Sequence, residues 1–313
     1  MIAYIVRRIL ATIPVMLMVA VFVFSLLYLA PGDPAAIIAG EEGSLQDIEQ
    51  IRASLNLGQP FLLRFGEWLL QLFKGDLGTS IYSGRPIVEH VQQRVEATVS
   101  LMVVSMAISV AIAVPLGVLA AWKKGSWIDR SVMVFAVFVF SVPVFVFGYA
   151  LSYLFGLQLR WLPIQGYAPL SSGFWPWLRT LILPATAMAS AFIGLQARMT
   201  RATMLEVLSQ DYIRTAKAKG LNQTVVLFQH ALKNAAVPIT TVVGLGVAGL
   251  LSGSVVIETV FALPGLGRLV ADAILRRDYP VIQSLTLIFG ITYVLVNLIV
   301  DLVYTIFDPR VRY

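Results

Sequence analysis

The chain has 313 residues, of which 58% are hydrophobic and only 13% are charged, and its formal net charge is +6. A soluble globular domain is roughly 45–50% apolar and about 25% charged, so a water-soluble fold of this length would have too little polar surface. The sequence has no cysteine, which excludes disulfides and thiol chemistry. Its two histidines, His90 and His230, lie far apart and do not favour a histidine metal site.

Six stretches of the sequence are long and apolar enough to cross a lipid bilayer. About 20 apolar residues in a helix span a hydrocarbon core of roughly 30 Å. The stretches exceed the roughly ten-residue alternating segments of a membrane barrel. The sequence therefore predicts an all-α polytopic membrane helix bundle. The expected spans cover residues 9–30, 99–122, 131–159, 180–197, 234–257 and 279–300.

The first span resembles a secretory signal, because it follows Arg7 and Arg8. However, it is longer than the roughly 7–15 residues of a signal-peptide core. It also ends in Pro31-Gly-Asp-Pro34 and not in a small-residue cleavage site. We interpret it as a retained helix that also directs the chain to the membrane.

Basic residues indicate how the bundle is oriented. An even number of spans places both termini on one side. With the termini inside, short inner segments hold Arg7 and Arg8 and also Lys123, Lys124 and Arg130. Because short cytoplasmic loops are enriched in Lys and Arg, we expect both termini in the cytoplasm of a bacterial cell and the spans in its inner membrane.

The first outer segment, residues 31–95, is predicted to contain two short helices. Ser44-x-x-Asp47 fits a capping box, and apolar residues follow it at helical spacing. Residues 61–73 carry a second apolar stripe with three aromatic Phe and one Trp. Such helices either lie on the membrane surface and cap the bundle or form a docking surface for an external partner.

The inner segment 198–235 has the pattern of two helices joined by a turn. Residues 204–219 are rich in helix formers, and Gly220 can end that helix. Asn222 can cap a second helix that runs to about residue 235. The segment is either a basic hairpin that touches lipid headgroups or a lever that transmits force from a soluble partner.

Two features within the expected spans need interpretation. Gly244-Leu-Gly-Val-Ala-Gly249 fits a dinucleotide fingerprint, but it lies in an apolar span without a preceding strand. We expect these small residues to allow close helix packing. Asp301 is an acidic residue near the inner end of the last span. It either reaches the interface or a local base, or it forms a gate or a subunit contact.

The inner segment closely resembles a known loop. Asp211-Tyr-Ile-Arg-Thr-Ala-Lys-Ala-Lys-Gly220, followed by His230-Ala-Leu-Lys-Asn-Ala-Ala-Val-Pro238, is similar to the coupling loop of ABC importer permeases of the dipeptide/oligopeptide/nickel family. The resemblance covers essentially the whole chain. Other matching motifs are Pro31-Gly-Asp-Pro34, Leu57-Gly-Gln-Pro60, Gly75-Asp-Leu-Gly-Thr-Ser80, Arg85-Pro86, Ala97-Thr98, Pro264-Gly-Leu-Gly-Arg268, Arg277-Asp-Tyr-Pro280 and Asp308-Pro-Arg310.

The resemblance implies a fold and a function. It implies an ABC type I importer transmembrane domain over residues 96–307, after an N-terminal helix (1–30) and the outer segment (31–95), with a short tail (308–313). The function would be that of a non-catalytic permease subunit that imports di- or oligopeptides, with glutathione-like peptides or nickel chelates as alternative cargoes. The implied partners are a second homologous permease, one or two cytosolic ATPase subunits that bind ATP and Mg, a periplasmic or lipid-anchored solute-binding protein, and membrane lipid. No nucleic acid and no cofactor of this chain are implied.

The resemblance also implies site residues. Gly220 would permit a sharp turn, and Ala216 and Ala218 would pack closely against the ATPase. Arg214 stands where the general loop has Glu, so no Glu-based contact carries over. The outer-loop motif comprises Pro264, Gly265, Gly267 and Arg268. The coupling residues are Asp211, Arg214, Ala216, Ala218, Gly220, His230, Leu232 and Asn234.

Two other functional classes remain alternatives to a permease subunit. An intramembrane enzyme would need paired Asp, Ser/His or metal ligands within the spans, and the expected spans hold no His, no Cys and no acid pair at depth. A stand-alone secondary transporter would favour an internal repeat and polar groups at the midplane. Neither feature is clear in the sequence.

Overall fold

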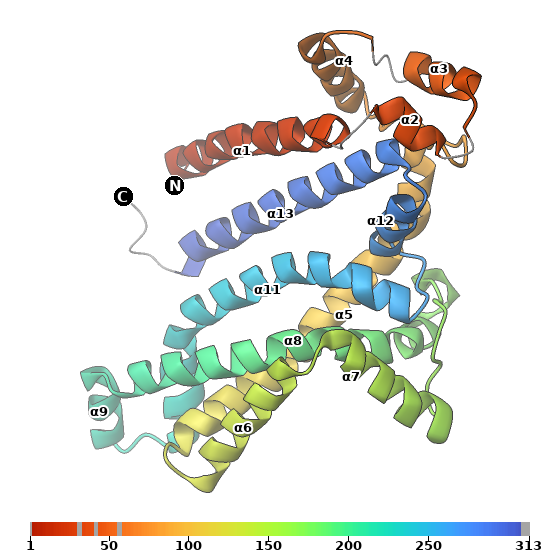
Figure 1. Cartoon of the computed structure of the whole chain (residues 1–313). Helices are drawn as coiled ribbons and strands as arrows, with labels where there is room; N and C mark the ends of the chain where they lie inside the picture. The colour runs from red at the N-terminus through yellow and green to blue at the C-terminus, as the bar shows by residue number, and fades with distance from the viewer. Residues whose placement is uncertain (1, 30–32, 41–42, 55–57, 308–313) are drawn as a thin grey trace.

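The computed structural model describes the chain except for residues 1, 30–32, 41–42, 55–57 and 308–313 (Figure 1). The described residues are almost entirely helical, and their only β-pairing is an isolated bridge between Thr79 and Pro86. The helices, including the short π- and 3-10 segments η1–η3, are α1 (Ile2–Leu29), α2 (Pro34–Ala39), α3 (Leu45–Ser54), α4 (Phe61–Phe73), α5 (Ile87–Trp122), α6 (Trp127–Ser141), α7 (Val144–Leu151), η1 (Ser152–Gln158), η2 (Leu170–Ser172), α8 (Phe174–Leu208), α9 (Asp211–Ala218), α10 (Gln223–Val225), η3 (Val226–Leu232), α11 (Lys233–Val260), α12 (Leu266–Leu275) and α13 (Tyr279–Phe307).

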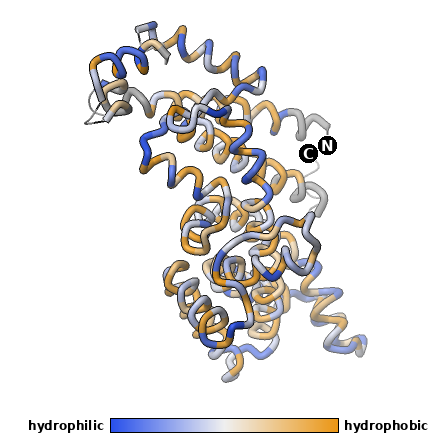
Figure 2. The backbone as a smooth tube through the Cα atoms, turned by 90° about the vertical axis from the view of Figure 1, so that its right-hand side faces the viewer, coloured by the Kyte–Doolittle hydropathy of each residue, from blue (hydrophilic) through white to orange (hydrophobic). Residues whose placement is uncertain are grey.

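The long helices confirm the predicted membrane bundle. Five are long and apolar enough to span a bilayer, and a bent pair makes up to six. Hydrophobic residues follow the long helices, and hydrophilic ones gather in the short helices and loops (Figure 2). The long helices run roughly side by side, with α9 at one end of the bundle and α2, α3, α4 and α12 at the other (Figure 1). We call these the α9 end and the α12 end.

The expected single span over residues 131–159 is wrong in one respect. The structure divides it into α6 and the α7–η1 helix, which are bent by 100° relative to one another. The break falls at Val142-Pro143, where Val142 is extended with ψ 125°. Proline disfavours a helical conformation in the preceding residue and cannot donate a backbone hydrogen bond. Pro143 therefore starts a new helix and does not merely kink an existing one.

The inner segment differs from its prediction at two points. Residues 204–208 end α8, and a turn at Ser209-Gln210 separates them from α9. The predicted helix over residues 204–219 is therefore two helices. The Asn222 cap is confirmed, because the Asn222 Oδ1 accepts a hydrogen bond from the Thr224 N–H at 3.2 Å. The helix that follows is continuous with α11 through η3, so it is the start of a span and not a separate element.

The outer helices cap the α12 end. The predicted capping box is confirmed, because the Ser44 Oγ accepts from the Asp47 N–H at 3.1 Å and the Asp47 carboxylate accepts from the Ser44 N–H at 3.0 Å. The apolar stripe of α4 packs on α1, where Phe24 contacts the rings of Phe65 and Trp68. The cap thus uses aromatic packing to hold α1 in place.

Glycines set the closest helix contacts. A Cβ atom at Gly244 would lie 2.2 Å from the Val300 side chain, and one at Gly249 would lie 2.9 Å from Phe192. These contacts confirm that the Gly244–Gly249 pattern serves helix packing. A Cβ at Gly194 in α8 would lie 2.3 Å from the Ala136 carbonyl oxygen of α6. The Ala136 backbone is part of a helix and cannot move aside as the end of a flexible side chain can.

We therefore expect Gly194→Val to destabilise the protein by about 1–3 kcal/mol or more, because it overpacks the α6–α8 contact. The measurement is thermal unfolding of the purified protein in detergent. Gly66→Ala in α4 is the control, because a Cβ there meets nothing within 4 Å and alanine favours a helix over glycine. Equal melting temperatures for the two variants would contradict this contact.

Candidate functional site

The α9 end carries a short helix with a tightly defined C-terminal turn. Gly220 has φ +76°, a left-handed conformation that favours glycine. Its N–H donates to the Lys217 carbonyl at 3.0 Å, and the Leu221 N–H donates to the Ala216 carbonyl at 3.3 Å. This pair of bonds is a Schellman motif. The prediction that Gly220 ends this helix is confirmed, and the turn fixes where the chain leaves α9.

The two faces of α9 have different environments. Ile213 and Ala216 are buried in a core that includes Met204 of α8 and Val226 of η3. Asp211, Arg214 and Ala218 are exposed on the opposite face. The Arg214–Asp211 pair at 3.4 Å is largely exposed on both sides and contributes little stability. Because Ala216 packs inside its own chain, only Ala218 of the two alanines is available to another protein.

The remaining coupling residues lie where η3 meets α11. His230 and Leu232 are half-buried in η3, and Asn234 is exposed. The Asn234 Nδ2 donates to the His230 carbonyl oxygen at 2.6 Å. This side-chain bond ties the end of η3 to the start of α11. The structure therefore places the predicted coupling residues at one end, in two adjacent helices.

An ion pair fixes α8 to α6 at the α9 end. The Arg201 guanidinium donates to both carboxylate oxygens of Asp129, at 2.5 and 2.8 Å. The Gly125 N–H donates to the same carboxylate at 2.9 Å, and the Asp129 side chain is only 5% exposed. This bidentate geometry orients α8 immediately before α9. No local pattern predicts this ion pair, because its partners are 72 residues apart in the chain.

At the α12 end, the predicted outer-loop motif surrounds a buried carboxylate. Glu258 of α11 is 0% exposed. Its carboxylate accepts from the Thr98 hydroxyl at 2.7 Å and from the Arg268 N–H at 2.9 Å. A Cβ at Gly265 would lie 2.2 Å from this carboxyl group. Glycine at this position therefore lets the loop approach Glu258, which links α5, α11 and the start of α12.

Glu258 was not among the predicted site residues, because the expected span ended at residue 257. The structure extends α11 to Val260, so Glu258 lies within the helix. A carboxylate six residues before Pro264-Gly-Leu-Gly-Arg268 was the available signal. The glycines of this motif allow the backbone to approach the buried carboxylate closely.

We expect Glu258→Gln to destabilise the protein by about 1.5–3 kcal/mol, because both donors lose a charged acceptor. The measurement is thermal unfolding of the purified protein, with proteolysis of the 262–268 loop as a local readout. Glu67→Gln on the exposed face of α4 is the control for the loss of one charge. A variant that melts and is cleaved like this control would show that the carboxylate does not hold the loop.

A second buried carboxylate fastens the outer segment to the bundle. Asp278, in the turn between α12 and α13, is 4% exposed. It accepts from the Ser80 hydroxyl at 2.5 Å and from the Ile81 N–H at 3.2 Å. Ser284 donates to the Leu77 carbonyl at 2.8 Å. Two motifs nearly 200 residues apart in sequence therefore form one contact.

The loop between η1 and α8 has its own hydrogen-bond network. The Tyr167 hydroxyl donates to Glu96 at 3.0 Å, and the Leu170 N–H donates to the same carboxylate oxygen at 2.7 Å. Burial raises the pKa of Tyr167, with the neighbouring Glu96 adding to the effect. The phenol therefore remains a donor at neutral pH. This network holds the loop against α5 at Glu96 and Ser100.

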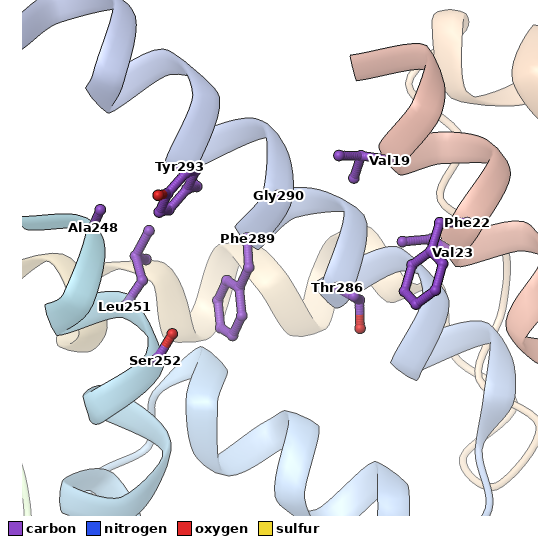
Figure 3. Close-up of a pocket in the computed structure, with 10 residues that line it drawn as sticks. All are labelled: Val19, Phe22, Val23, Ala248, Leu251, Ser252, Thr286, Phe289, Gly290 and Tyr293. Atoms are coloured by element: carbon purple, nitrogen blue, oxygen red, sulfur yellow. The ribbon is translucent and has the colours of Figure 1, made fainter. Parts of the chain in front are cut away.

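The bundle contains a buried polar pair, and an apolar cavity opens between three of its helices. Ser109 of α5 donates to Gln196 of α8 at 2.8 Å, and Ser105 and Thr200 are buried one turn away on the same two helices. A cavity of about 280 Å³ lies among α1, α11 and α13 (Figure 3). Its polar groups are the hydroxyls of Ser252, Thr286 and Tyr293. Hydroxyls alone cannot neutralise the charged ends of a peptide.

Two further kinds of site were considered from the residue types, namely a metal site and a gate at Asp301. Among the described residues, no group of three or more His, Cys, Asp or Glu side chains is placed to hold a metal ion. Asp301 lies in α13, but its side chain is outside the described part of the chain, as are residues 31–32 and the 308–310 motif. The gate or contact role of Asp301 remains a prediction.

Comparison with known proteins decides the family. The family described as binding-protein-dependent transport system inner membrane component matches residues 113–313. The N-terminal part of such membrane components matches residues 1–103. The chain belongs to this family of inner membrane transport components. The predicted family is thereby confirmed, and so is the location in a membrane.

Relatives of this transport component align along its whole length. A probable peptide ABC transporter permease of Sinorhizobium fredii is 50% identical over 310 residues, which cover 99% of each chain. A dipeptide transport system permease of Alkalihalophilus pseudofirmus is 40% identical, with full coverage of both chains. A glutathione transport system permease of Salmonella choleraesuis is 41% identical over 313 residues, again with full coverage.

A solved structure confirms the fold of the transport component. The MetNI methionine ABC transporter, in an inward-facing conformation, matches with a TM-score of 0.59 at 18% identity. The match covers 71% of this chain and 97% of that chain. This likeness confirms the predicted type of transmembrane domain and carries no information about cargo.

Proposed function

We propose that this component is the permease subunit of an ATP-driven importer of di- or oligopeptides and forms half of the translocation path. The observation that carries the proposal is α9, an exposed helix that is held between two long helices and closed by the Gly220 turn. Relatives named as peptide and dipeptide permeases support the cargo class. The chain itself would perform no catalysis, and ATP and Mg would bind to partner ATPases.

In this proposal α9 inserts into a groove of a cytosolic ATPase subunit. Asp211, Arg214 and Ala218 present the exposed face, and Gly220 sets the turn beside it. The buried face shares one core with α8 and η3. A displacement of α9 would therefore move both adjoining spans. The ATPase must contact α9 differently in its two nucleotide states, because equal contacts would shift no equilibrium.

The proposed orientation follows from the same assignment. The α9 end, with the start of α1 and the end of α13, faces the cytoplasm. The α12 end faces outward, toward a solute-binding protein that delivers cargo. A second homologous permease completes the path. The buried Glu258 and Asp278 then hold the outer loops in place beside the entrance.

The deciding experiment is purification of the chain from native membranes under mild detergent, followed by ATPase and uptake assays. We expect a second permease and ATPase subunits to co-purify. ATP hydrolysis should rise when the binding protein and a dipeptide are added, and proteoliposomes should accumulate labelled dipeptide. A stable complex that lacks any ATPase in gentler lipid conditions as well would instead favour a secondary transporter.

Glutathione-like peptides are the second candidate cargo, favoured by the relative named as a glutathione permease. A competition assay for uptake distinguishes the dipeptide cargo from the glutathione-like cargo. Unlabelled dipeptides should reduce uptake of labelled dipeptide more strongly than glutathione does at equal concentration. The reverse order would assign the importer to glutathione-like peptides.

A further inference from the structure

A second cavity lies beside α9, outside the residues assigned so far. It has a volume of about 260 Å³ and is bounded by the ends of α5 and α8, by α9 and by α10. Lys124 and Lys217 line it, together with Ser209 and Gln223. Among the described residues that line the cavity, none is a carboxylate. The site therefore combines two ammonium groups with two neutral polar side chains.

Nearby acids do not neutralise these lysines. Asp129 is held by Arg201, and Asp211 is paired with Arg214. Within the described part of the chain, neither Lys124 nor Lys217 has an ion-pair partner. Ile213 and Ala216 are the buried residues of α9. Lys217 follows Ala216 directly and is four residues, about one helical turn, after Ile213. Lys217 therefore lies at the edge of the buried face of α9, and it lines the cavity.

The other wall of the cavity is apolar. Trp122, Leu205, Leu208 and Val226 line it, and Trp122 is 41% exposed at the end of the α5 span. Tryptophan and lysine at the end of a span are typical of the headgroup level of a membrane. A basic cavity between helices at the cytoplasmic face suits an anionic headgroup whose chains extend along an apolar wall.

We propose that this cavity binds a phosphate-ester anion, namely the headgroup of an anionic phospholipid of the inner leaflet. The phosphate would lie between the Lys124 and Lys217 ammonium groups, with the Gln223 amide as a further hydrogen-bond donor, because the Ser209 hydroxyl already donates to the Glu206 carbonyl at 2.7 Å. The bound lipid would join α9 to the end of α5. The leaflet, and the link to coupling, rest on the proposed function, whereas the anion site does not.

Native mass spectrometry of the complete complex tests the site, using nanodiscs that contain phosphatidylcholine and phosphatidylglycerol. Lys124→Ala/Lys217→Ala should retain about tenfold less phosphatidylglycerol than the unaltered complex, because two cationic contacts are lost. Lys219→Ala/Lys233→Ala is the matched control. It removes the same charge from two exposed positions that do not line the cavity, and it should retain the lipid. Equal retention in the two double variants would overturn the proposal.

A second arm separates the lipid from free phosphate. In phosphatidylcholine-only discs, inorganic phosphate should not raise the melting temperature of the unaltered complex. A rise that Lys124→Ala/Lys217→Ala abolishes would overturn the lipid as ligand and assign the site to free phosphate. Peptide-stimulated ATPase activity, measured on the same samples, reports separately on the proposed function. If the unaltered complex shows no peptide-stimulated ATPase activity, the proposed function is rejected, and the lipid measurement is unaffected.

Discussion

Arg201→Ala is expected to lower the free energy of unfolding by about 2–3 kcal/mol, because it leaves the buried Asp129 carboxylate without its charged partner, although Arg201 itself is 27% exposed. The Asp129 carboxylate is 5% exposed and receives two hydrogen bonds from the guanidinium. After the substitution, the Gly125 N–H is its remaining strong donor among the described contacts. The measurement is thermal or denaturant unfolding of the purified protein, with the yield of membrane-inserted chain as a second readout.

Arg198→Ala is the matched control for this change. Arg198 lies one turn earlier in α8, is exposed, and has only a distant contact with the Phe140 ring, at 6.0 Å. Its removal should cost well under 1 kcal/mol. Adding Asp129→Asn to Arg201→Ala should recover much of the lost stability, because the unpaired charge is then gone. If Arg201→Ala unfolds like the control, the ion pair does not hold α6 against α8.

Gly220→Val is expected to reduce uptake by about tenfold or more, because L-residues lose roughly 1–2 kcal/mol in the left-handed conformation and β-branched ones lose more. Gly220 has φ +76°, and a Cβ there meets nothing within 4 Å. The expected effect therefore comes from the backbone and not from a clash within this chain. The measurement is ATP-dependent uptake in proteoliposomes, together with basal and peptide-stimulated ATP hydrolysis.

Gly220→Asn separates the conformation of the turn from the mere presence of a side chain. Asparagine tolerates the left-handed region and occurs at this position of helix C-terminal turns. It should keep most of the uptake, and both variants should insert and assemble normally. Equal uptake by the Val and Asn variants would show that the Schellman turn does not position α9 for coupling.

Three buried carboxylates share one property that bears on the whole fold. Asp129, Glu258 and Asp278 each join segments that are remote in sequence, through Arg201, Thr98 and Ser80 respectively. An unpaired carboxylate in such a place would be strongly destabilising. Each therefore specifies how its helices or loops must meet, at both ends of the bundle.

Local pattern was enough to determine the class of fold. Uninterrupted apolar runs must be helical in a bilayer, because only a helix satisfies its backbone hydrogen bonds within the segment. The Ser44 capping box, the Gly220 turn and the Asn222 cap depend on neighbours within a few residues. These features followed from the sequence by itself, as did the family resemblance of the 211–238 stretch.

Tertiary structure decided the rest, because it depends on contacts between distant segments. A proline alone can leave a span continuous but kinked. The 100° break before Pro143 is possible here because α7 packs against α8. Hydropathy ended the expected span at residue 257, just before Glu258, and only the contact with the 264–268 loop shows why Glu258 is buried. Likewise, α9 has alanines at positions 216 and 218. Which one faces a partner depends on the core that buries the other.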